Sequence, residues 1–190
     1  MIRVLVFTTL YPNAAQPSHG VFVENRLEQL VGSGAVTARV VAPIPTFPLL
    51  DRVWPPFRAT RAAPAEETRR GIEVLHPRYP LLPKVSMTAA PFSLYAATRP
   101  LLERIRAEGF DFDLIDAHYF YPDGVAAAML GRALGRPVVI TGRGTDLNLI
   151  PDYALPRRMI RWAARQAAGL VTVCAALKES LVELGVPAEK

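Results

Sequence analysis

Short apolar runs alternate along the chain with stretches whose apolar positions repeat at helical spacing. Residues 4–9 are almost continuously apolar, which is typical of a strand buried on both faces of a parallel sheet. Val23, Leu27 and Leu30 follow at the spacing of one helix face, and the glycines of residues 32–34 end that pattern. We predict six strands, at residues 4–9, 37–42, 71–76, 110–117, 137–141 and 169–174.

Helices are predicted between these strands. Pro91 fits a first helical turn, whereas Pro100 implies a kink or a break in its helix. Strands that alternate with helices indicate an α/β, Rossmann-like fold, doubly wound, with helices on both faces of a mainly parallel sheet in the order 3-2-1-4-5-6. The predicted helices cover residues 21–31, 87–107, 123–134, 156–168 and 175–184.

Residues 43–86 interrupt this alternation. The segment holds half of the chain's 18 prolines, and only residues 71–76 within it have a convincing strand pattern. A long irregular excursion is usually functional or disordered, and its aromatic residues favour partial order against the body or a partner. Because no shift in composition marks a boundary, we treat residues 1–190 as one domain.

Composition narrows the class of protein. A chain of 190 residues with 51% hydrophobic and 21% charged residues can form a globular core, and its single cysteine excludes an internal disulfide framework. The net charge of +5 permits an anionic partner such as a phosphate, a nucleotide or an acidic membrane, or is simply a solvated basic surface. We find no bilayer-spanning run, signal peptide or nucleic-acid-binding pattern, and we expect a cytoplasmic protein.

Candidate chemistry gathers in three loops that follow strands, at residues 8–22, 118–124 and 142–153. In doubly wound sheets, ligands bind at the carboxyl ends of the strands where the strand order reverses. Gly20 would let a ligand approach the backbone, or the loop is an ordinary turn with Ser18 as a local cap. His118 is a proton carrier, a partner of sugar hydroxyls or a structural histidine. Asp123 lies where a helix N-cap belongs.

The third loop places Arg143 between two glycines, with Asp146 three residues later. Arg143 offers a two-pronged donor for a phosphate or carboxylate, and Asp146 could accept hydrogen bonds from substrate hydroxyls. The alternative is that the two side chains pair and shape the loop. The aromatic residues 119–121 either stack on a sugar ring or pack at the helix entry.

Several other patterns are weak or absent. The chain has no dinucleotide fingerprint in residues 8–23, no phosphate-binding P-loop, no nucleophile elbow and no zinc-protease motif. Arg158, Arg161 and Arg165 share one helix face near Trp162, which suits an anionic lipid surface or a solvated face. Cys174 ends an apolar strand and is expected to be buried.

Five segments carry a family resemblance when they are taken in order. They are Tyr11-Pro12, residues 20–24 (GVFVE), residues 113–118 (DLIDAH), residues 137–146 (PVVITGRGTD) and residues 169–178 (GLVTVCAALK). Together they cover nearly the whole chain, and it resembles the N-terminal lobe of retaining, family-4-type glycosyltransferases with the GT-B fold. Each segment alone is weak, whereas their order and spacing are specific.

The resemblance implies one lobe of a two-lobe enzyme. The N-terminal lobe binds the acceptor, and a C-terminal lobe that is absent from this chain binds the sugar nucleotide. Transfer in such enzymes retains the anomeric configuration, usually without a metal, so no cofactor is expected. Acceptors are often lipid-linked, which implies a sugar acceptor, contact with an anionic membrane at its inner face and no nucleic-acid partner. This chain alone is expected to be inactive.

The resemblance also directs attention to particular residues. Arg143-Gly144 stands where many members have a His-Gly pair, so any role of Arg143 is electrostatic, for example on a phosphate. Gly20 stands alone where many members have paired glycines. The residues expected in the site are Asp146 and His118 as catalytic groups, and Gly20, Arg143, Gly144, Thr145 and Tyr119 as substrate-binding groups.

Two alternatives to this interpretation remain open. The chain could be a non-catalytic module that binds a glycolipid or a protein partner. It could also belong to another GT-B enzyme, either an inverting transferase, with His118 or Asp146 as general base, or a sugar-nucleotide epimerase.

Overall fold

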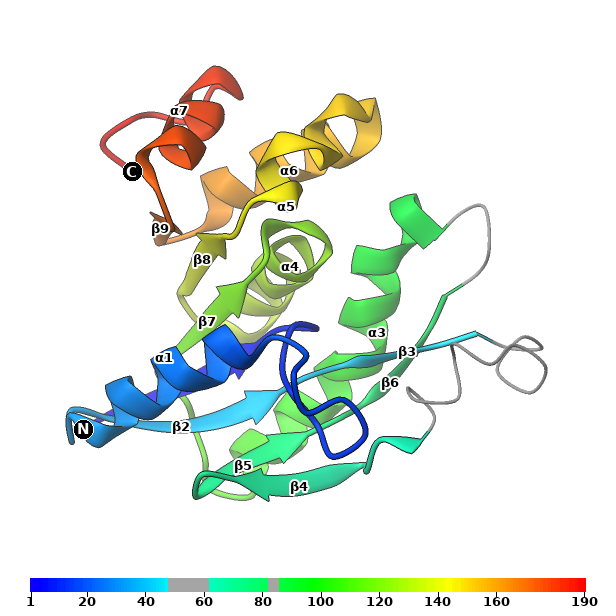
Figure 1. The fold of residues 1–190 in the computed structure, drawn as a ribbon, viewed down its shortest axis with the longest axis vertical. Coiled ribbons are helices and arrows are strands. Elements are labelled where there is room, and N and C mark those ends of the chain that lie inside the picture. Colours follow the sequence, from blue (N-terminus) through cyan, green and yellow to red (C-terminus); the bar gives the residue numbers. More distant parts are fainter. Residues whose placement is uncertain (48–61, 82–85) are drawn as a thin grey trace.

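One mainly parallel sheet organises the part of the chain that the structure describes. This structure is a computed structural model, and it describes residues 1–47, 62–81 and 86–190. The strand order is β4-β5-β2-β1-β7-β8-β9, and every pair is parallel except β4 with β5 (Figure 1). The strands are β1 (Ile2–Phe7), β2 (Val36–Val41), β4 (Glu66–Arg69), β5 (Ile72–Leu75), β7 (Leu114–His118), β8 (Val138–Gly142) and β9 (Gly169–Thr172).

Alternation along β1 sends its side chains into two separate cores. Val4 and Val6 pack in the core under α1, whereas Leu5 and Phe7 belong to the core on the opposite face. All four side chains are buried because β1 lies at the centre of a sheet that is covered on both sides.

Helices cover both faces of the sheet. Val23 and Leu27 of α1 pack on one face, and Leu94 of α3 and Leu130 of α4 pack on the other. No helix in residues 1–47, 62–81 and 86–190 combines the length and apolar character needed to cross a membrane. The helices are α1 (Val21–Gly32), α3 (Ser86–Ala107), α4 (Val125–Leu134), α5 (Thr145–Asn148), α6 (Ala154–Gln166) and α7 (Ala175–Glu183), with single turns at Phe120–Gly124 and Ile150–Asp152.

The predicted fold class and strand order are confirmed, because the six predicted strands correspond to β1, β2, β5, β7, β8 and β9 in the expected order. The expectation of a single strand in residues 43–86 is wrong. The segment also contains β4 at the sheet edge, and β3 (Ile44–Thr46) pairs with β6 (Arg78–Pro80) in a second small sheet. These strands have three or four residues and little apolar alternation, so the sequence pattern missed them. Residues 48–61 and 82–85 of that excursion lie outside the described residues.

Of the kink or break predicted at Pro100, the break is wrong, since α3 continues through both prolines, and Pro91 lies inside the helix rather than in its first turn. Proline leaves the carbonyl four residues earlier without its helical donor, here that of Ala96. Ala96 and Pro100 are both exposed, so water can hydrogen-bond to the Ala96 carbonyl. Buried Leu94 and Leu102 on either side hold the helix against the core.

Cys174 does not lie inside the core, contrary to expectation. β9 ends at Thr172, and Cys174 is exposed at the residue that precedes α7. The apolar run is therefore longer than the strand, and its last residues, Val173 and Cys174, are exposed.

Candidate functional site

The three predicted loops meet at the carboxyl edge of the sheet. β1 lies between β2 and β7, so the strand order reverses beside it, and β8 follows β7. Strand register places Phe7 opposite Ala117 and His118 opposite Thr141. The loops after β1, β7 and β8 therefore leave the sheet side by side.

Asp146 organises the loop after β8. Its carboxylate is fully buried and accepts backbone hydrogen bonds from Phe120 (2.5 Å), Arg143 (3.0 Å) and Gly144 (2.7 Å). The alternative that the Arg143 and Asp146 side chains pair is wrong, because Asp146 bonds to the Arg143 backbone and the guanidinium contacts His118. One carboxylate fixes this loop and joins it to the loop after β7.

Asp123 joins the loops after β1 and β7. Its carboxylate is fully buried and accepts hydrogen bonds from the Thr9 backbone N–H (2.6 Å), the Thr9 hydroxyl (3.0 Å) and the Thr8 hydroxyl (3.3 Å). The predicted N-cap role is wrong, because Gly124 precedes α4 and Asp123 is turned toward β1. Burial raises the pKa of Asp123 to about 7, although the hydrogen bonds from Thr9 and Thr8 act to lower it.

His118 is fully buried between two arginines. Arg143 Nη2 lies 2.9 Å from Nδ1 of the ring, and Nε2 lies 3.4 Å from Oδ2 of Asp116. Arg26 Nη1 donates to the same Asp116 oxygen at 2.7 Å. Because a guanidinium only donates, Nδ1 accepts from Arg143 at the shorter distance, and the ring proton belongs on Nε2, where it meets Asp116. Arg26 Nη1 also lies 3.4 Å from Nε2. Burial lowers the pKa of His118 and favours this neutral form.

The cluster brings Arg26, Arg143 and Asp116 together at a partly open surface. Burial alone would raise the pKa of Asp116, but His118 and Arg26 hold it below its usual value, so Asp116 is ionised. Burial, together with the charge of Arg26, lowers the pKa of Arg143, which as an arginine stays charged. The Arg143 guanidinium stacks 4.9 Å from the centre of the Phe22 ring. Phe22 is 46% exposed, so this side of the cluster faces solvent.

Gly20 is constrained by the protein's own backbone. Its φ of +68° lies in the left-handed region, and a Cβ there would lie 2.3 Å from the Leu10 carbonyl carbon. The predicted Ser18 cap is wrong, because Gly20 is the N-cap residue of α1 and no side chain caps that end. A role of Gly20 toward a ligand stays a prediction.

The remaining expected site residues lie around this cluster. Gly144 has a φ of +146°, and Thr145 after it is exposed. Tyr119 is half-buried, and burial raises its pKa against a hydrogen bond with Thr145. Phe120 and Tyr121 are buried, which confirms the packing interpretation for these two aromatic residues.

Sequence reasoning missed Arg26, and it noted Phe22 and Asp116 only as parts of motifs. The spacing of Phe22 and Arg26 was the available signal, since residues four apart share one helix face. Nothing in the sequence indicated that this face of α1 meets the strand end that carries Asp116.

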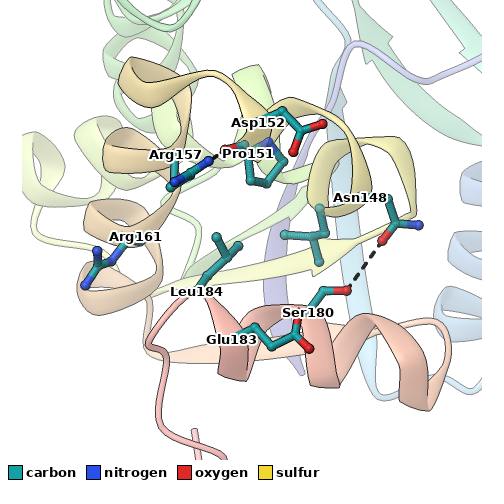
Figure 2. A pocket seen from close by; sticks show the side chains of 9 residues that line it. Asn148, Pro151, Asp152, Arg157, Arg161, Ser180, Glu183 and Leu184 are labelled. Carbon is teal, nitrogen blue, oxygen red and sulfur yellow. Dashed lines mark hydrogen bonds between the residues drawn. The ribbon is translucent and has the colours of Figure 1, made fainter.

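Two hollows lie beside the cluster rather than within it. One of about 450 Å³ lies between α5, α6 and α7 and has a mostly polar lining (Figure 2). Ser180 of α7 lies 3.5 Å from the Asn148 side chain there. A second hollow of about 330 Å³ between α3, α4 and α6 is lined by apolar side chains and Arg158. The charged cluster instead reaches solvent as an open edge.

In the described parts of the chain, no three or more His, Cys, Asp or Glu side chains are grouped so that they could hold a metal ion. The donors assembled at the edge are arginine and backbone N–H groups, which suit anions.

Comparison with known families gives this edge a context. The family model Glycosyltransferase Family 4 matches residues 59–190. The chain belongs to glycosyltransferase family 4. A Bacillus subtilis (strain 168) protein named as a teichuronic acid biosynthesis glycosyltransferase, TuaC, is 30% identical over 183 residues, or 96% of this chain. The chain spans 46% of the length of that family relative.

Solved structures support the fold class of this family 4 chain. A protein from Listeria monocytogenes named as a UDP-N-acetylglucosamine 2-epimerase aligns over 98% of this chain and 43% of its own, with a TM-score of 0.58 and 13% identity. The UDP-GlcNAc 2-epimerase of Neisseria meningitidis aligns over 100% of this chain and 45% of its own, with a TM-score of 0.55 and 18% identity. At such low identity the likeness concerns the fold alone.

Proposed function

We propose that this chain is the acceptor-binding lobe of a retaining glycosyltransferase. The whole enzyme would move a sugar from a nucleotide-sugar donor to a glycan or lipid-linked acceptor. The buried charged cluster at the carboxyl edge carries the proposal, because it lies where doubly wound sheets bind ligands. Family membership and the share of TuaC that the chain spans support a donor-binding lobe outside this chain.

The proposed mechanism gives each residue a role at this edge. Asp146 fixes the Arg143 and Gly144 backbone, and His118 fixes the direction of the Arg143 guanidinium. Arg143, held in place before substrate arrives, stabilises negative charge on the acceptor or on the departing phosphate. Thr145 and Tyr119 offer hydroxyl groups beside it. No metal and no cofactor is proposed, since the nucleotide sugar is itself a substrate.

A transfer assay tests this function. A protein that carries both lobes should release nucleoside diphosphate only when an acceptor is present, and the glycosidic bond formed should keep the donor's anomeric configuration by NMR. The 190-residue chain alone should show no transfer. An inverted product would remove the retaining mechanism, and a two-lobe protein that epimerises its sugar nucleotide without an acceptor would replace the transferase proposal.

We also propose that α6 rests on an anionic membrane at its cytoplasmic face. α6 carries four exposed arginines and no acidic side chain. The apolar hollow beside it includes Phe92 and Leu155, which are 51% and 52% exposed, and Trp162. A basic helix beside exposed apolar side chains has the chemistry that binds acidic bilayers. No nucleic-acid partner is proposed.

Vesicle sedimentation tests the membrane contact. The chain should bind vesicles of phosphatidylglycerol and phosphatidylcholine, release at high salt, and ignore pure phosphatidylcholine. The variant Arg158→Glu/Arg165→Glu should lose binding, whereas Arg104→Glu on α3 should keep most of it. Equal loss in both variants would indicate a general charge effect and contradict a role for α6.

A further inference from the structure

The two arginines of the cluster differ in how their charge is compensated. Arg26 forms an ion pair with Asp116 at 2.7 Å. Arg143 has no ion pair with a carboxylate anywhere in residues 1–47, 62–81 and 86–190, and its guanidinium contacts neutral His118 and the face of Phe22. The Asp146 carboxylate, which lies nearby, is occupied by backbone N–H groups. The Arg143 guanidinium therefore makes no direct ion pair, although the charges of Asp116 and Asp146 act on it from nearby.

Unsatisfied polar atoms lie at the same place. Nε of Arg143 and Oδ1 of Asp116 are both buried, and neither atom has a hydrogen-bond partner. The Asp116 side chain is only 6% exposed, so Oδ1 is a buried, unpartnered acceptor, while the other oxygen of the same carboxylate accepts from Arg26. Buried polar atoms in folded proteins normally have partners, and those that lack them often mark a place where a ligand binds.

The cluster is also fixed before any ligand arrives. The Phe22 ring supports one face of the Arg143 guanidinium, and His118 holds its Nη2. Arg26 extends from α1 on the other side of the His118 ring, with 42% of its side chain exposed. Nδ1 of His118 must stay unprotonated to accept the hydrogen bond from Arg143. The neutral ring therefore separates the two guanidinium groups without adding charge.

We infer that Arg26 and Arg143 form an oxyanion subsite, which selects acceptors that carry a phosphate or carboxylate group. This inference rests on the proposed function, because it assigns the acceptor class of the same edge. Guanidinium groups match the geometry of both oxyanions, and the free Asp116 oxygen would accept a hydroxyl of the same sugar. An uncharged sugar would leave the Arg143 guanidinium without a direct ion-pair partner.

Titration with small probes tests the subsite directly on the 190-residue chain. Inorganic pyrophosphate, D-glucuronate and D-glucose are added in turn, and NMR follows the Nε–H resonances of Arg26 and Arg143. We expect saturable shifts with pyrophosphate, glucuronate or both, and none with glucose. Pyrophosphate alone would identify a phosphate-bearing acceptor, and glucuronate alone an acidic sugar. No saturable shift with either anion overturns the subsite.

Variants separate the subsite from general electrostatic attraction. Arg26→Gln and Arg143→Gln should each weaken anion binding about tenfold or more. Arg143→Lys keeps the charge but loses the planar fork, and should weaken binding less. Arg104→Gln is the matched control, because Arg104 also pairs with a carboxylate, Glu108, but lies on α3 near the opposite edge of the sheet. An equal loss in Arg104→Gln would contradict the inference.

Thermal melting of each variant shows that it is folded. If Arg143→Gln does not fold, Arg26→Gln and Arg143→Lys still decide the question. The two proposals can fail separately. Transfer by the two-lobe protein to neutral acceptors, with no anion binding, would remove the subsite alone. Arginine-dependent anion binding without any transfer would remove the transferase function alone.

Discussion

Helix α1 separates two charged clusters that use the same residue types in different ways. On one side Glu24, which is 2% exposed, bonds to Arg69 at 2.6 Å and lies 3.4 Å from Arg70. On the other side Arg26 pairs with Asp116 beside His118. The first cluster fastens the β4–β5 hairpin to α1, whereas the second lies at the open carboxyl edge.

The histidines of the two clusters show the contrast most clearly. His76 places Nδ1 3.0 Å from the Ala42 carbonyl and Nε2 3.0 Å from Glu67, so both ring nitrogens face acceptors. His118 faces a donor, Arg143, on one side and an acceptor, Asp116, on the other. Direct ion pairs hold the hairpin in place, whereas the Arg143 guanidinium makes none with the described residues, and its buried Nε has no hydrogen-bond partner.

The largest effect on stability is expected from a substitution that breaks the cluster of Glu24, Arg69 and Arg70, which we call the hairpin cluster. Glu24→Gln removes the buried charge that compensates Arg69, so we expect a loss of about 3 kcal/mol in the free energy of unfolding. Urea denaturation measures it. Glu28→Gln is the matched control, because Glu28 on the same helix also pairs with an arginine but is 40% exposed. A loss below about 1 kcal/mol for Glu24→Gln would contradict the structural role of this cluster.

Replacing Asp146 should have the next largest effect on stability. Asp146→Ala leaves three backbone N–H groups without their acceptor, and should cost about 2 kcal/mol while it abolishes transfer by the two-lobe protein. Urea denaturation and turnover are measured together. Asp152→Ala, at an exposed residue of the same loop, should change neither. Full turnover in a folded Asp146→Ala protein would exclude Asp146 from the site.

The lowered pKa of His118 predicts a pH dependence of stability. Below about 6.5 the unfolded chain binds a proton that folded His118 resists, so stability is lost as the pH falls. The raised pKa of Asp123 acts oppositely, since its contribution is lost as the pH rises toward about 7. The stability difference between wild type and His118→Gln isolates the histidine, and it should shrink between pH 7 and pH 5. A constant difference would contradict a neutral, buried His118.

The smallest stability effect is expected at Arg26. Arg26→Gln removes the part-exposed partner of the buried Asp116 carboxylate, which keeps its contact with His118, and should lower the free energy of unfolding by about 1 kcal/mol. The same variant should strongly weaken anion binding. Glu24 and Arg26 lie two positions apart on α1. Replacing Glu24 would then mainly lower stability, whereas replacing Arg26 would mainly weaken anion binding. A destabilisation by Arg26→Gln as large as that by Glu24→Gln would remove the distinction between the clusters.

The sequence was sufficient for the sheet because its central strands are continuous apolar runs with clear ends. Such runs fix which segments are buried, and the rules for parallel connections then give the strand order. The apolar pattern does not predict β4, because its residues Glu66–Arg69 are polar and pair with β5 at the edge of the sheet. Pro100 misled the prediction because exposure, which the sequence does not reveal, decides whether the broken helix bond matters.

The candidate site was predictable only in its location. Loops that follow neighbouring parallel strands must meet, which brought His118, Arg143 and Asp146 together as expected. Most of their partners could not be read from spacing. Apart from the bonds of Asp146 to Arg143 and Gly144 in its own loop, the hydrogen bonds of the site join residues on different loops or elements. Asp123 accepts from Thr9, 114 residues earlier, and Arg26 meets Asp116, 90 residues later.

The exposed Cys174 is a natural site for attaching a fluorescent label. It is the only cysteine in the sequence, so a maleimide dye would attach at one known point, beside the open edge of β9. With a second dye on the donor-binding lobe that we propose, energy transfer would report how the two lobes approach each other during turnover. No native residue of this chain would have to be replaced for that experiment.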